Sequence, residues 1–401
     1  MHFGRDRPSS LPRTVVLLGF TSLFTDIGTE MIFPLLPVFL AEVLHAGPEY
    51  IGLVEGVAVT VASLLKLASG VVADIVPRRK PLVLFGYGLA SAVRPLVALA
   101  TRPWHVLAVR VTDRVGKGIR SSPRDALIAD AAGARAGRAF GFHQAMDNAG
   151  AVVGPLVATA VLALGFSMRQ VFWIAVVPGT VATALVALIR EAPAAPRARV
   201  LAKTSRPAAL PPGLASFLAI LALFSLSNSS DAFLLLRAHA LGVSTAQIPI
   251  LWSVLNASKV IWSWLGGGWA DRVSHARLVA GGWLVYALVY VGLGVADADW
   301  QVWGLFVVYG VFYGLTEPVE KALVSELVPR EQRGRAFGAF NFIEGIAALP
   351  AGLLTGLLWR VYGLARALEV GASMAALASV LLLGWEAWRR GHGATRRGEA
   401  R

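Results

Sequence analysis

Long runs of apolar residues dominate this chain and restrict what it can fold into. Stretches such as 152–165, 171–189 and 214–226 contain no charged residue. A helix needs roughly 20 mainly apolar residues to cross a hydrocarbon core, whereas a spanning strand needs a shorter segment of alternating polarity, which is not visible here. Because backbone groups find no water in that core, these runs indicate spanning helices.

Composition supports this interpretation. Hydrophobic residues make up 56% of the 401 residues and charged residues only 15%, whereas soluble globular chains are about 25% charged. We therefore predict an all-α membrane protein with twelve transmembrane helices in two six-helix bundles. The expected spans are 14–42, 50–73, 81–101, 104–128, 139–165, 170–190, 214–240, 246–270, 277–296, 300–328, 336–359 and 363–388.

The placement of charge predicts how the chain lies in the membrane. The formal net charge is +13, yet the turns after odd-numbered spans carry few Lys or Arg residues, while every turn on the other side is basic. Cytoplasmic loops of membrane proteins carry this excess. We expect an integral protein of the cytoplasmic (inner) membrane with both termini in the cytoplasm, and no nucleic-acid partner. The chain has no cysteine, which excludes disulfides and thiolate metal sites.

The chain also contains an internal repeat. Segment 70–74 recurs at 267–271 and segment 138–141 recurs at 335–338, both displaced by 197 positions. Asp147 and Glu344 share this register, and three matches in one register favour a duplication of a six-helix unit. The expected organisation is a cytoplasmic N-terminal segment (1–13), an N-terminal bundle (14–190), a cytoplasmic linker (191–213), a C-terminal bundle (214–389) and a cytoplasmic tail (390–401).

Three local patterns add to the hydropathy. The turn after the second span holds Gly70, Asp74, Arg78, Arg79 and Lys80, with an echo at Asp271. The fourth span contains Arg114-x-x-Lys117-Gly118, and the fifth contains Gly141, Gly150, Gly154 and Pro155. On these patterns the sequence resembles the major facilitator superfamily over nearly its whole length, and within it the bacterial proton-coupled drug or metabolite antiporters. It departs from the family where Pro77 and Lys117 replace the usual Gly and Gln, and where no glycine pair follows Pro155.

The resemblance implies a secondary transporter that moves a small solute by alternating access, with no enzymatic activity and no cofactor, working as a monomer. It implies that the pattern from Gly70 to Lys80 acts as a gate between the two halves. It also implies that the bend at Pro155 seals the path between them. Gly150 and Gly154 lie on one face and permit close helix approach, so simple close packing is the alternative explanation.

Ionisable residues inside spans are costly and usually functional. Asp26 and Glu30 lie four residues apart in the first span, hence on one helical face. Burial and mutual repulsion both favour their protonated forms, which suits a proton carrier. Permanent pairing with nearby Arg or Lys is the alternative. The proton or cation coupling candidates are Asp26, Glu30, Asp147, Glu317 and Glu344.

The fourth span carries a charged stripe. Its ionisable residues recur at steps of three and four from Arg110 to Arg124, which places them along one side of a helix. A cationic stripe facing a cavity suits an anionic solute, or a carboxylate that changes partners during transport. We expect Arg120 and Arg124 at the cytoplasmic end and not in the cavity. The substrate cavity candidates are Arg110, Asp113, Arg114, Lys117, His143, Asn228, Asp231, Asn256, Tyr309, Tyr313 and Asn341.

Several functions remain open from the sequence. Proton-coupled export is favoured by the glycine pattern and the acidic residues, and symport or exchange of an anionic metabolite by the cationic stripe. Divalent cation export is favoured by four possible ligands, Asp26, Glu30, His143 and Asp147. A channel or membrane receptor on the same fold is the non-transporting alternative. An ATP-driven pump is disfavoured because residues 116–118 lack the spacing of a phosphate-binding loop. No metal site is predicted.

Overall fold

The computed structural model describes residues 11–75, 78–132, 136–191, 211–270, 273–329 and 332–398. These residues form helices and short connections, without a strand. The elements are α1 (Arg13–Ile32), η1 (Phe33–Leu35), α2 (Leu36–Val38), η2 (Phe39–Val43), α3 (Pro48–Ile75), α4 (Lys80–Val93), η3 (Arg94–Leu99), α5 (Pro103–Ala132), α6 (Ala136–Ala163), α7 (Met168–Ile174), α8 (Val176–Ala187), α9 (Pro212–Ser227), α10 (Asp231–Ala240), α11 (Ile248–Ala270), α12 (His275–Val295), α13 (Asp299–Glu326), α14 (Arg333–Tyr362) and α15 (Leu364–Gly398).

Consecutive elements combine into twelve helical passes across the described residues. The first pass runs from α1 to η2, and the pairs α4 with η3, α7 with α8, and α9 with α10 each form one further pass. Ten passes are long and apolar enough to cross a membrane. The α5 helix is not among those ten, because the predicted charged stripe interrupts its apolar character. The predicted all-α, twelve-helix architecture is confirmed.

Two of the passes are broken near their middle. Pro34 and Pro37 lack a backbone N–H, and the first pass changes there from α-helix to 3-10 and π turns. The seventh pass stops at Ser227 and restarts at Asp231, where the Ser230 hydroxyl accepts a hydrogen bond from the backbone N–H of Ala232 at 3.2 Å. This cap places Asp231 at the first residue of α10, inside the break.

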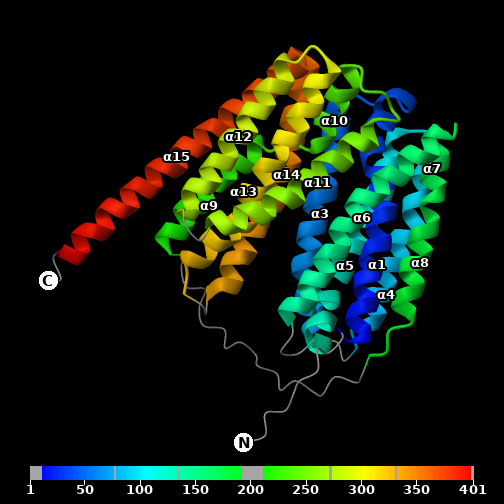
Figure 1. Ribbon diagram of the computed structural model, residues 1–401, viewed down its shortest axis with the longest axis horizontal. Helices are drawn as coiled ribbons and strands as arrows, with labels where there is room; N and C mark the ends of the chain where they lie inside the picture. Colours follow the sequence, from blue (N-terminus) through cyan, green and yellow to red (C-terminus); the bar gives the residue numbers. More distant parts are fainter. Residues whose placement is uncertain are drawn as a thin grey trace, which may run out of the picture.

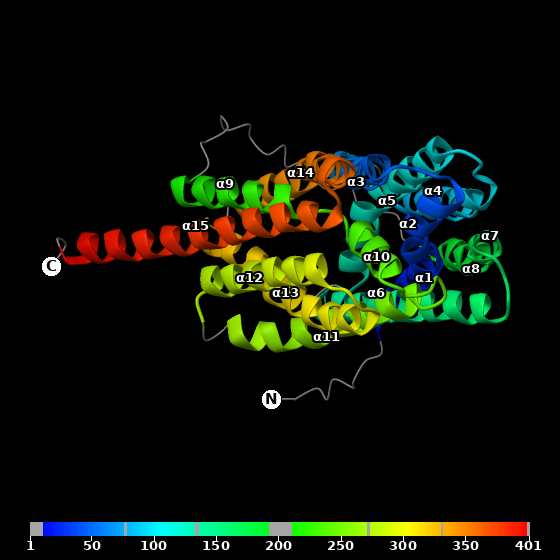
Figure 2. The same ribbon diagram turned by 90° about the horizontal axis from the view of Figure 1, so that it is seen from above.

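The helices form two groups, α1 to α8 and α9 to α15. They meet where α3 lies beside α14, where α6 lies beside α11, and where α10 reaches across to α2 (Figures 1 and 2). Glycines permit the first of these approaches, since a Cβ at Gly56 would lie 2.7 Å from the Leu349 Cα and one at Gly52 would collide with the Gly352 carbonyl. Small residues at such positions allow membrane helices to pack closely.

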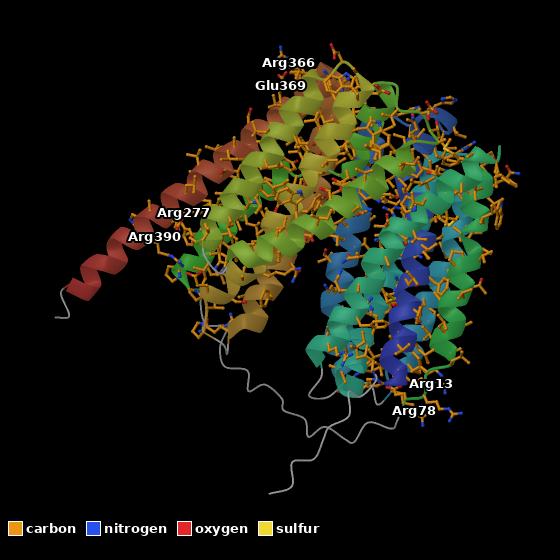
Figure 3. All side chains as sticks on the ribbon, in the orientation of Figure 1. Arg13, Arg78, Arg277, Arg366, Glu369 and Arg390 are labelled. Carbon is orange, nitrogen blue, oxygen red and sulfur yellow. The ribbon has the colours of Figure 1, made fainter. Side chains whose placement is uncertain are left out.

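The two ends of the molecule differ. We call the end that carries Arg13 and Arg78 the basic end; there the two groups of helices diverge (Figures 1 and 3). At the other end, which we call the acidic end, the two groups are joined by charged contacts. The Nε2 atom of His239 lies 2.6 Å from Glu42, and Arg360 donates to Glu49 at 3.2 Å. The structure is therefore closed at the acidic end.

Candidate functional site

A cavity of about 540 Å³ lies between the two groups of helices. Both groups contribute to its wall, as expected for a site at the interface of two repeats. Ten of the predicted site residues line it. These are Asp26, Glu30, Arg110, Arg114, Lys117, Asn228, Asp231, Tyr313, Asn341 and Glu344.

The two carboxyl groups of α1 face this cavity from one side of the helix. The glycines of α6 lie directly behind them: a Cβ at Gly150 would be 2.8 Å from the Asp26 Cβ, and one at Gly154 would be 2.9 Å from the Glu30 Cβ. The Glu30 carboxylate also accepts a 2.7 Å hydrogen bond from the indole N–H of Trp252 in α11. The structure thus joins two features that were separate in the sequence, the acidic pair and the glycine pattern.

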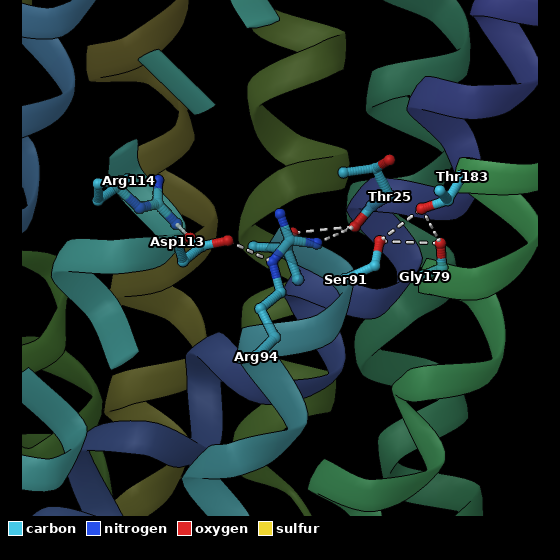
Figure 4. A network of polar contacts seen from close by, with 8 residues as sticks. Thr25, Ser91, Arg94, Asp113, Arg114, Gly179 and Thr183 are labelled. Atoms are coloured by element: carbon cyan, nitrogen blue, oxygen red, sulfur yellow. Dashed lines mark hydrogen bonds and ion pairs between the residues drawn. The ribbon is translucent and has the colours of Figure 1, made fainter. Parts of the chain in front are cut away.

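The N-terminal part of the α5 stripe, residues 110–114, is held in buried ion pairs. Asp113 accepts a hydrogen bond from Arg94 at 2.6 Å and forms an ion pair with Arg114 at 2.9 Å, and its side chain is 3% exposed. One turn away, Arg110 pairs with Glu55 of α3 at 2.5 Å. Figure 4 shows Asp113 between the two guanidinium groups. Arg110 and Asp113 are therefore both neutralised by neighbouring side chains, and Asp113 does not line the main cavity.

A second network supports the helix that carries Arg94. The Arg94 guanidinium donates to the Thr25 carbonyl at 3.2 Å, which ties it to α1. Close by, the Ser91 hydroxyl donates to the Gly179 carbonyl at 2.8 Å, and the Thr183 hydroxyl donates to Ser91 at 3.1 Å (Figure 4). These bonds connect α4 to α8 and hold the polar wall in place.

The rest of the stripe, towards Arg124, is different. Arg124 pairs with Asp125 at 2.8 Å, but the two cations before it have no acidic partner of their own in the part of the chain that the structure describes. Lys117 is exposed to the cavity, and neither Lys117 nor Arg120 has an ion pair among the described residues. Arg120 is 4% exposed and lies 4.1 Å above the Tyr87 ring. Its Nε and one terminal nitrogen have no hydrogen-bond partner. The expectation that Arg120 lies at the cytoplasmic end was wrong: α5 extends to Ala132, which leaves Arg120 about three turns inside the helix.

A smaller cavity of about 310 Å³ adjoins the main one on the side of the basic end. The two share Asp26, Lys117 and Arg120 in their walls, and the smaller one also contains Asp147. Asp147 accepts a hydrogen bond from the Ser22 hydroxyl. His143, one turn away on α6, is buried, and its Nδ1 lies 3.8 Å from Asp147. These two predicted residues therefore lie beside the main cavity and not in its wall.

The opposite wall is built around Asp231, at the helix break of the seventh pass. Its carboxylate accepts hydrogen bonds from the hydroxyls of Tyr309 at 2.9 Å and Tyr313 at 2.8 Å. Lys259 lies 4.0 Å from the same carboxylate and 3.5 Å above the Tyr313 ring. The charge of Asp231 is thus neutralised within its own wall. Tyr309 is fully buried, so it orients Asp231 without reaching the cavity.

The remaining polar candidates have other positions. Glu317 is exposed and does not line a described cavity. The Asn256 amide donates to the Ala151 carbonyl at 3.3 Å and so joins α11 to α6. The Asn341 amide donates to the Phe337 carbonyl of its own helix at 2.7 Å while it lines the cavity. A Cβ at Gly141 would meet nothing within 4 Å, and so Gly141 does not share the close packing of the later glycines.

The predicted gate residues are described only in part. Asp271 lies outside the described residues, and for Gly70 and Asp74 only the backbone, which is helical, is described. Arg78 is exposed at the basic end (Figure 3). The backbone N–H groups of Arg79 and Lys80 donate to the two carboxylate oxygens of Glu191 at 2.7 and 2.9 Å. Arg79 also pairs with Asp130 at 2.5 Å. These contacts lie within one group of helices, at the first turn of α4, where a carboxylate is favoured.

Sequence reasoning missed Glu55 and Trp252, both of which line the cavity. Glu55 had a detectable signal, because it is an ionisable residue inside an apolar span. Trp252 had none, since an aromatic residue in a spanning helix is unremarkable until its partner, Glu30, is placed beside it.

Comparisons with known proteins agree with this architecture. The family model described as Major Facilitator Superfamily matches residues 18–352 and 213–399. An uncharacterized MFS-type transporter of Methanocaldococcus jannaschii, MJ1317, is 32% identical over 358 residues, which cover 88% of this chain and 89% of that protein. The multidrug resistance protein MdtH of Cronobacter sakazakii is 31% identical over 123 residues, 31% of this chain and 29% of that protein.

A solved structure shows the same fold. The nucleoside transporter NupG superposes with a TM-score of 0.76 over 93% of this chain and 98% of that one, at 14% sequence identity. At that identity the likeness concerns the fold alone. The family model and the relative at 32% identity establish more: the protein is an integral membrane transporter of the major facilitator superfamily.

Proposed function

We propose that this protein is a proton-coupled secondary transporter of the cytoplasmic (inner) membrane, in which Asp26 and Glu30 carry the proton. The bundles 14–190 and 214–389 rock about the central cavity, with both termini in the cytoplasm and one chain as the working unit. Asp147, in the adjoining cavity, and Glu344, across the main one, are further proton carriers in this proposal. Glu317 is less suited to carry a proton, because it is exposed and lines neither of the two cavities.

The single observation that carries the proposal is the position of the acidic pair. Asp26 and Glu30 line the cavity between the two halves, where a bound proton and a bound solute would act on each other directly. Glu30 is joined to the other half through Trp252, so a change in its charge alters a contact that crosses the interface. Carboxyl groups so placed are suited to couple protonation to the rocking of the halves.

Alternating access supplies the transport step. The contacts of Glu42 with His239 and of Glu49 with Arg360 hold the acidic end closed, while the helices diverge at the basic end. With the basic end in the cytoplasm, this arrangement is the inward-facing state. Breaking a few such interface contacts and forming others at the basic end would give the outward-facing state.

The direction of transport depends on how solute and proton affect each other. Export by exchange requires that they compete, so that each drives the other off the acidic pair. This mode is supported by the packing of Gly150 and Gly154 against that pair, and by the partial similarity to proteins named for multidrug resistance. It makes lipophilic cations and neutral solutes the natural substrates.

The second mode is cotransport of an anion with a proton. The unpaired guanidinium of Arg120 and the cavity-facing Lys117 favour it, because protonation of Asp26 removes the negative charge that competes with an anion for these cations. Divalent cation export has no comparable support, since the described residues contain no group of three or more His, Asp or Glu side chains that could hold a metal ion.

The test is proton movement in proteoliposomes with a lumenal pH dye, starting without a pH gradient and with the membrane potential clamped. Exchange predicts that an added lipophilic cation makes the lumen more alkaline, whereas cotransport predicts that an added organic anion makes it more acidic. Asp26→Asn and Glu30→Gln should reduce either response to that of protein-free liposomes. Asp297→Asn, which removes an exposed carboxylate at the acidic end, serves as the control.

The two carboxyl variants decide the assignment. Normal proton movement in both would remove Asp26 and Glu30 as carriers. A large electrical current that does not saturate with solute would favour a channel, and solute binding without any flux would favour a receptor.

A further inference from the structure

We propose that the transported solute carries a negatively charged group, which Arg114, Lys117 and Arg120 of α5 bind together. The inference rests on the proposed function, because it takes the central cavity as the solute site, and it selects the cotransport mode.

The first argument is geometric. The three residues are spaced three apart on one helix, and all of them line the same cavity. A guanidinium group is planar and offers several N–H donors, which match the oxygens of a carboxylate, sulfonate or phosphate. A small organic anion is therefore of the right shape and charge for this stripe.

The second argument is that donors are left over. Arg114 Nε has no hydrogen-bond partner, and neither do Nε and one terminal nitrogen of Arg120, although all of these atoms are buried. A buried donor without an acceptor is costly, more so when it belongs to a charged group. An anion bound here would supply the acceptors that the protein does not.

The third argument is the balance of charge in the wall. Asp113 is shared by Arg94 and Arg114, and Glu55 is taken by Arg110. On the opposite wall, Asp231 is already satisfied by two tyrosines and lies close to Lys259. Lys117 and Arg120 are therefore the cations without an acidic partner of their own, and Arg114, although paired with Asp113, still has its unpartnered Nε for a ligand.

The cavity also limits what else the solute contains. Phe33, Phe224 and Trp252 line it beside the charged groups, and Asn228 contributes a polar amide from the helix break. An anion with a compact apolar body would contact both kinds of surface. Most small-molecule sites combine an apolar lining with a few polar groups in this way.

The position of Asp26 sets the sign of coupling. The charged groups that act on it are Glu30 on its own helix, Lys117 and Arg120 on α5, and Asp147 on α6. An ionised Asp26 offsets the two cations and weakens their hold on an anion, whereas a protonated Asp26 does not. Anion and proton therefore bind more tightly together than apart, which is the requirement for cotransport.

The experiment is calorimetric titration of the purified full-length protein in detergent. The anionic probes are benzenesulfonate, succinate and methyl phosphate, which separate sulfonate, carboxylate and phosphate chemistry. Benzenesulfonamide is the neutral match and phenyltrimethylammonium the cationic one. We expect at least one anion to bind, about tenfold or more tightly than the neutral and cationic probes, as a charge-assisted hydrogen bond predicts. Failure of all three anions, or preference for the cation, overturns the inference.

Variants locate the site. Lys117→Gln and Arg120→Gln should each weaken anion binding by about tenfold, while Arg366→Gln, which removes a surface cation paired with Glu369 at the acidic end, should leave it unchanged (Figure 3). Equal affinity in all three variants would place the anion elsewhere. The comparison of probes on the unmodified protein stays decisive even if a variant does not fold.

The pH dependence tests the coupling sign. Benzenesulfonate stays charged throughout the accessible range, so any change in its affinity reports on the protein. Its affinity should rise as the pH falls. In Asp26→Asn, which mimics the protonated side chain, the affinity should be high at every pH. These measurements need no proton gradient. If anions do not bind yet cations still drive proton movement in proteoliposomes, the anion inference fails while the proposed function stands.

Discussion

The carboxylate of Asp113 holds together the part of the α5 stripe that is fully buried. It forms ion pairs with two arginines of different helices, one of them, Arg94, also donating a hydrogen bond, and its side chain is almost inaccessible. Two positive charges and one negative charge occupy this space, and Glu55 and Arg110 form the next pair along the helix. In a low-dielectric interior such an arrangement is stable only while every partner is present.

Asp113→Asn should therefore be strongly destabilising. The substitution leaves Arg94 and Arg114 buried beside each other without a counter-charge, and breaking a buried pair typically costs about 3–5 kcal/mol. Thermal melting in detergent should show a clear drop in Tm. Asp297→Asn removes an exposed carboxylate and should change stability by no more than about 0.5 kcal/mol. An unchanged Tm for Asp113→Asn would show that Arg94 and Arg114 do not depend on this carboxylate for their burial.

How far the candidate site could be predicted also differs from residue to residue. Asp26, Glu30, Arg114 and Lys117 could be chosen because an ionisable residue in an apolar span is conspicuous. Arg120 was assigned to the wrong place, because a cation near the end of a predicted span looks the same whether it faces the cytoplasm or a cavity. Trp252 became a candidate only when α11 was placed against α1.

At the scale of elements, the contact of α6 with α1 has a direct test. A Cβ at Gly154 would lie 2.7 Å from the Ile27 carbonyl oxygen, which is backbone and cannot rotate away. Gly154→Ala should force the two helices apart and cost about 1–3 kcal/mol, as overpacking does. Transport should fall as well, because Asp26 and Glu30 lie on the displaced face.

Gly141 provides the matched control on the same helix. A Cβ there meets nothing within 4 Å, so Gly141→Ala should gain about 0.5–1 kcal/mol from the better helix propensity of alanine. Melting curves and transport assays of the two variants test the contrast. Equal effects at both positions would indicate that α1 and α6 are not in close contact in the membrane.

The elements themselves were largely predictable. Every predicted span has a counterpart in the structure, because apolar runs and charged turns are local features of the chain. The break between α9 and α10 was visible as a polar interruption at residues 228–231. The 3-10 and π turns that follow α1 were not anticipated, although Pro34 and Pro37 offered a signal.

At the scale of the whole molecule, the closed acidic end can be locked. Glu42 and His239 are in side-chain contact across the two halves, and the chain has no native cysteine to interfere. The double variant Glu42→Cys/His239→Cys should be bridged by a short bifunctional methanethiosulfonate reagent, because the native side chains meet only at their ends and two cysteines there are too far apart for a direct disulfide. The cross-link should abolish transport, since a fixed acidic end prevents alternating access. Reduction should restore activity.

Each single-cysteine variant should transport normally after the same treatment. Full activity of the cross-linked double variant would show that the acidic end need not open, which contradicts alternating access by rocking of the two halves.

The sequence by itself determined the helical passes, the membrane setting and the family, since these depend on apolar length, on the side of the basic turns and on short local patterns. The internal repeat likewise needed only the spacing of matching segments. Helical periodicity was enough to place Arg114, Lys117 and Arg120 on one face of α5.

The tertiary structure alone decided which charges are neutralised and which stay available. Asp113 meets Arg94 and Glu55 meets Arg110 because α4 and α3 pack beside α5, and no periodicity within one helix contains that information. The helical repeat determines only the side of α5 on which a side chain lies. Which residue it meets there depends on the packing of helices that are far apart in the chain, and this packing leaves Lys117 and Arg120 facing the cavity.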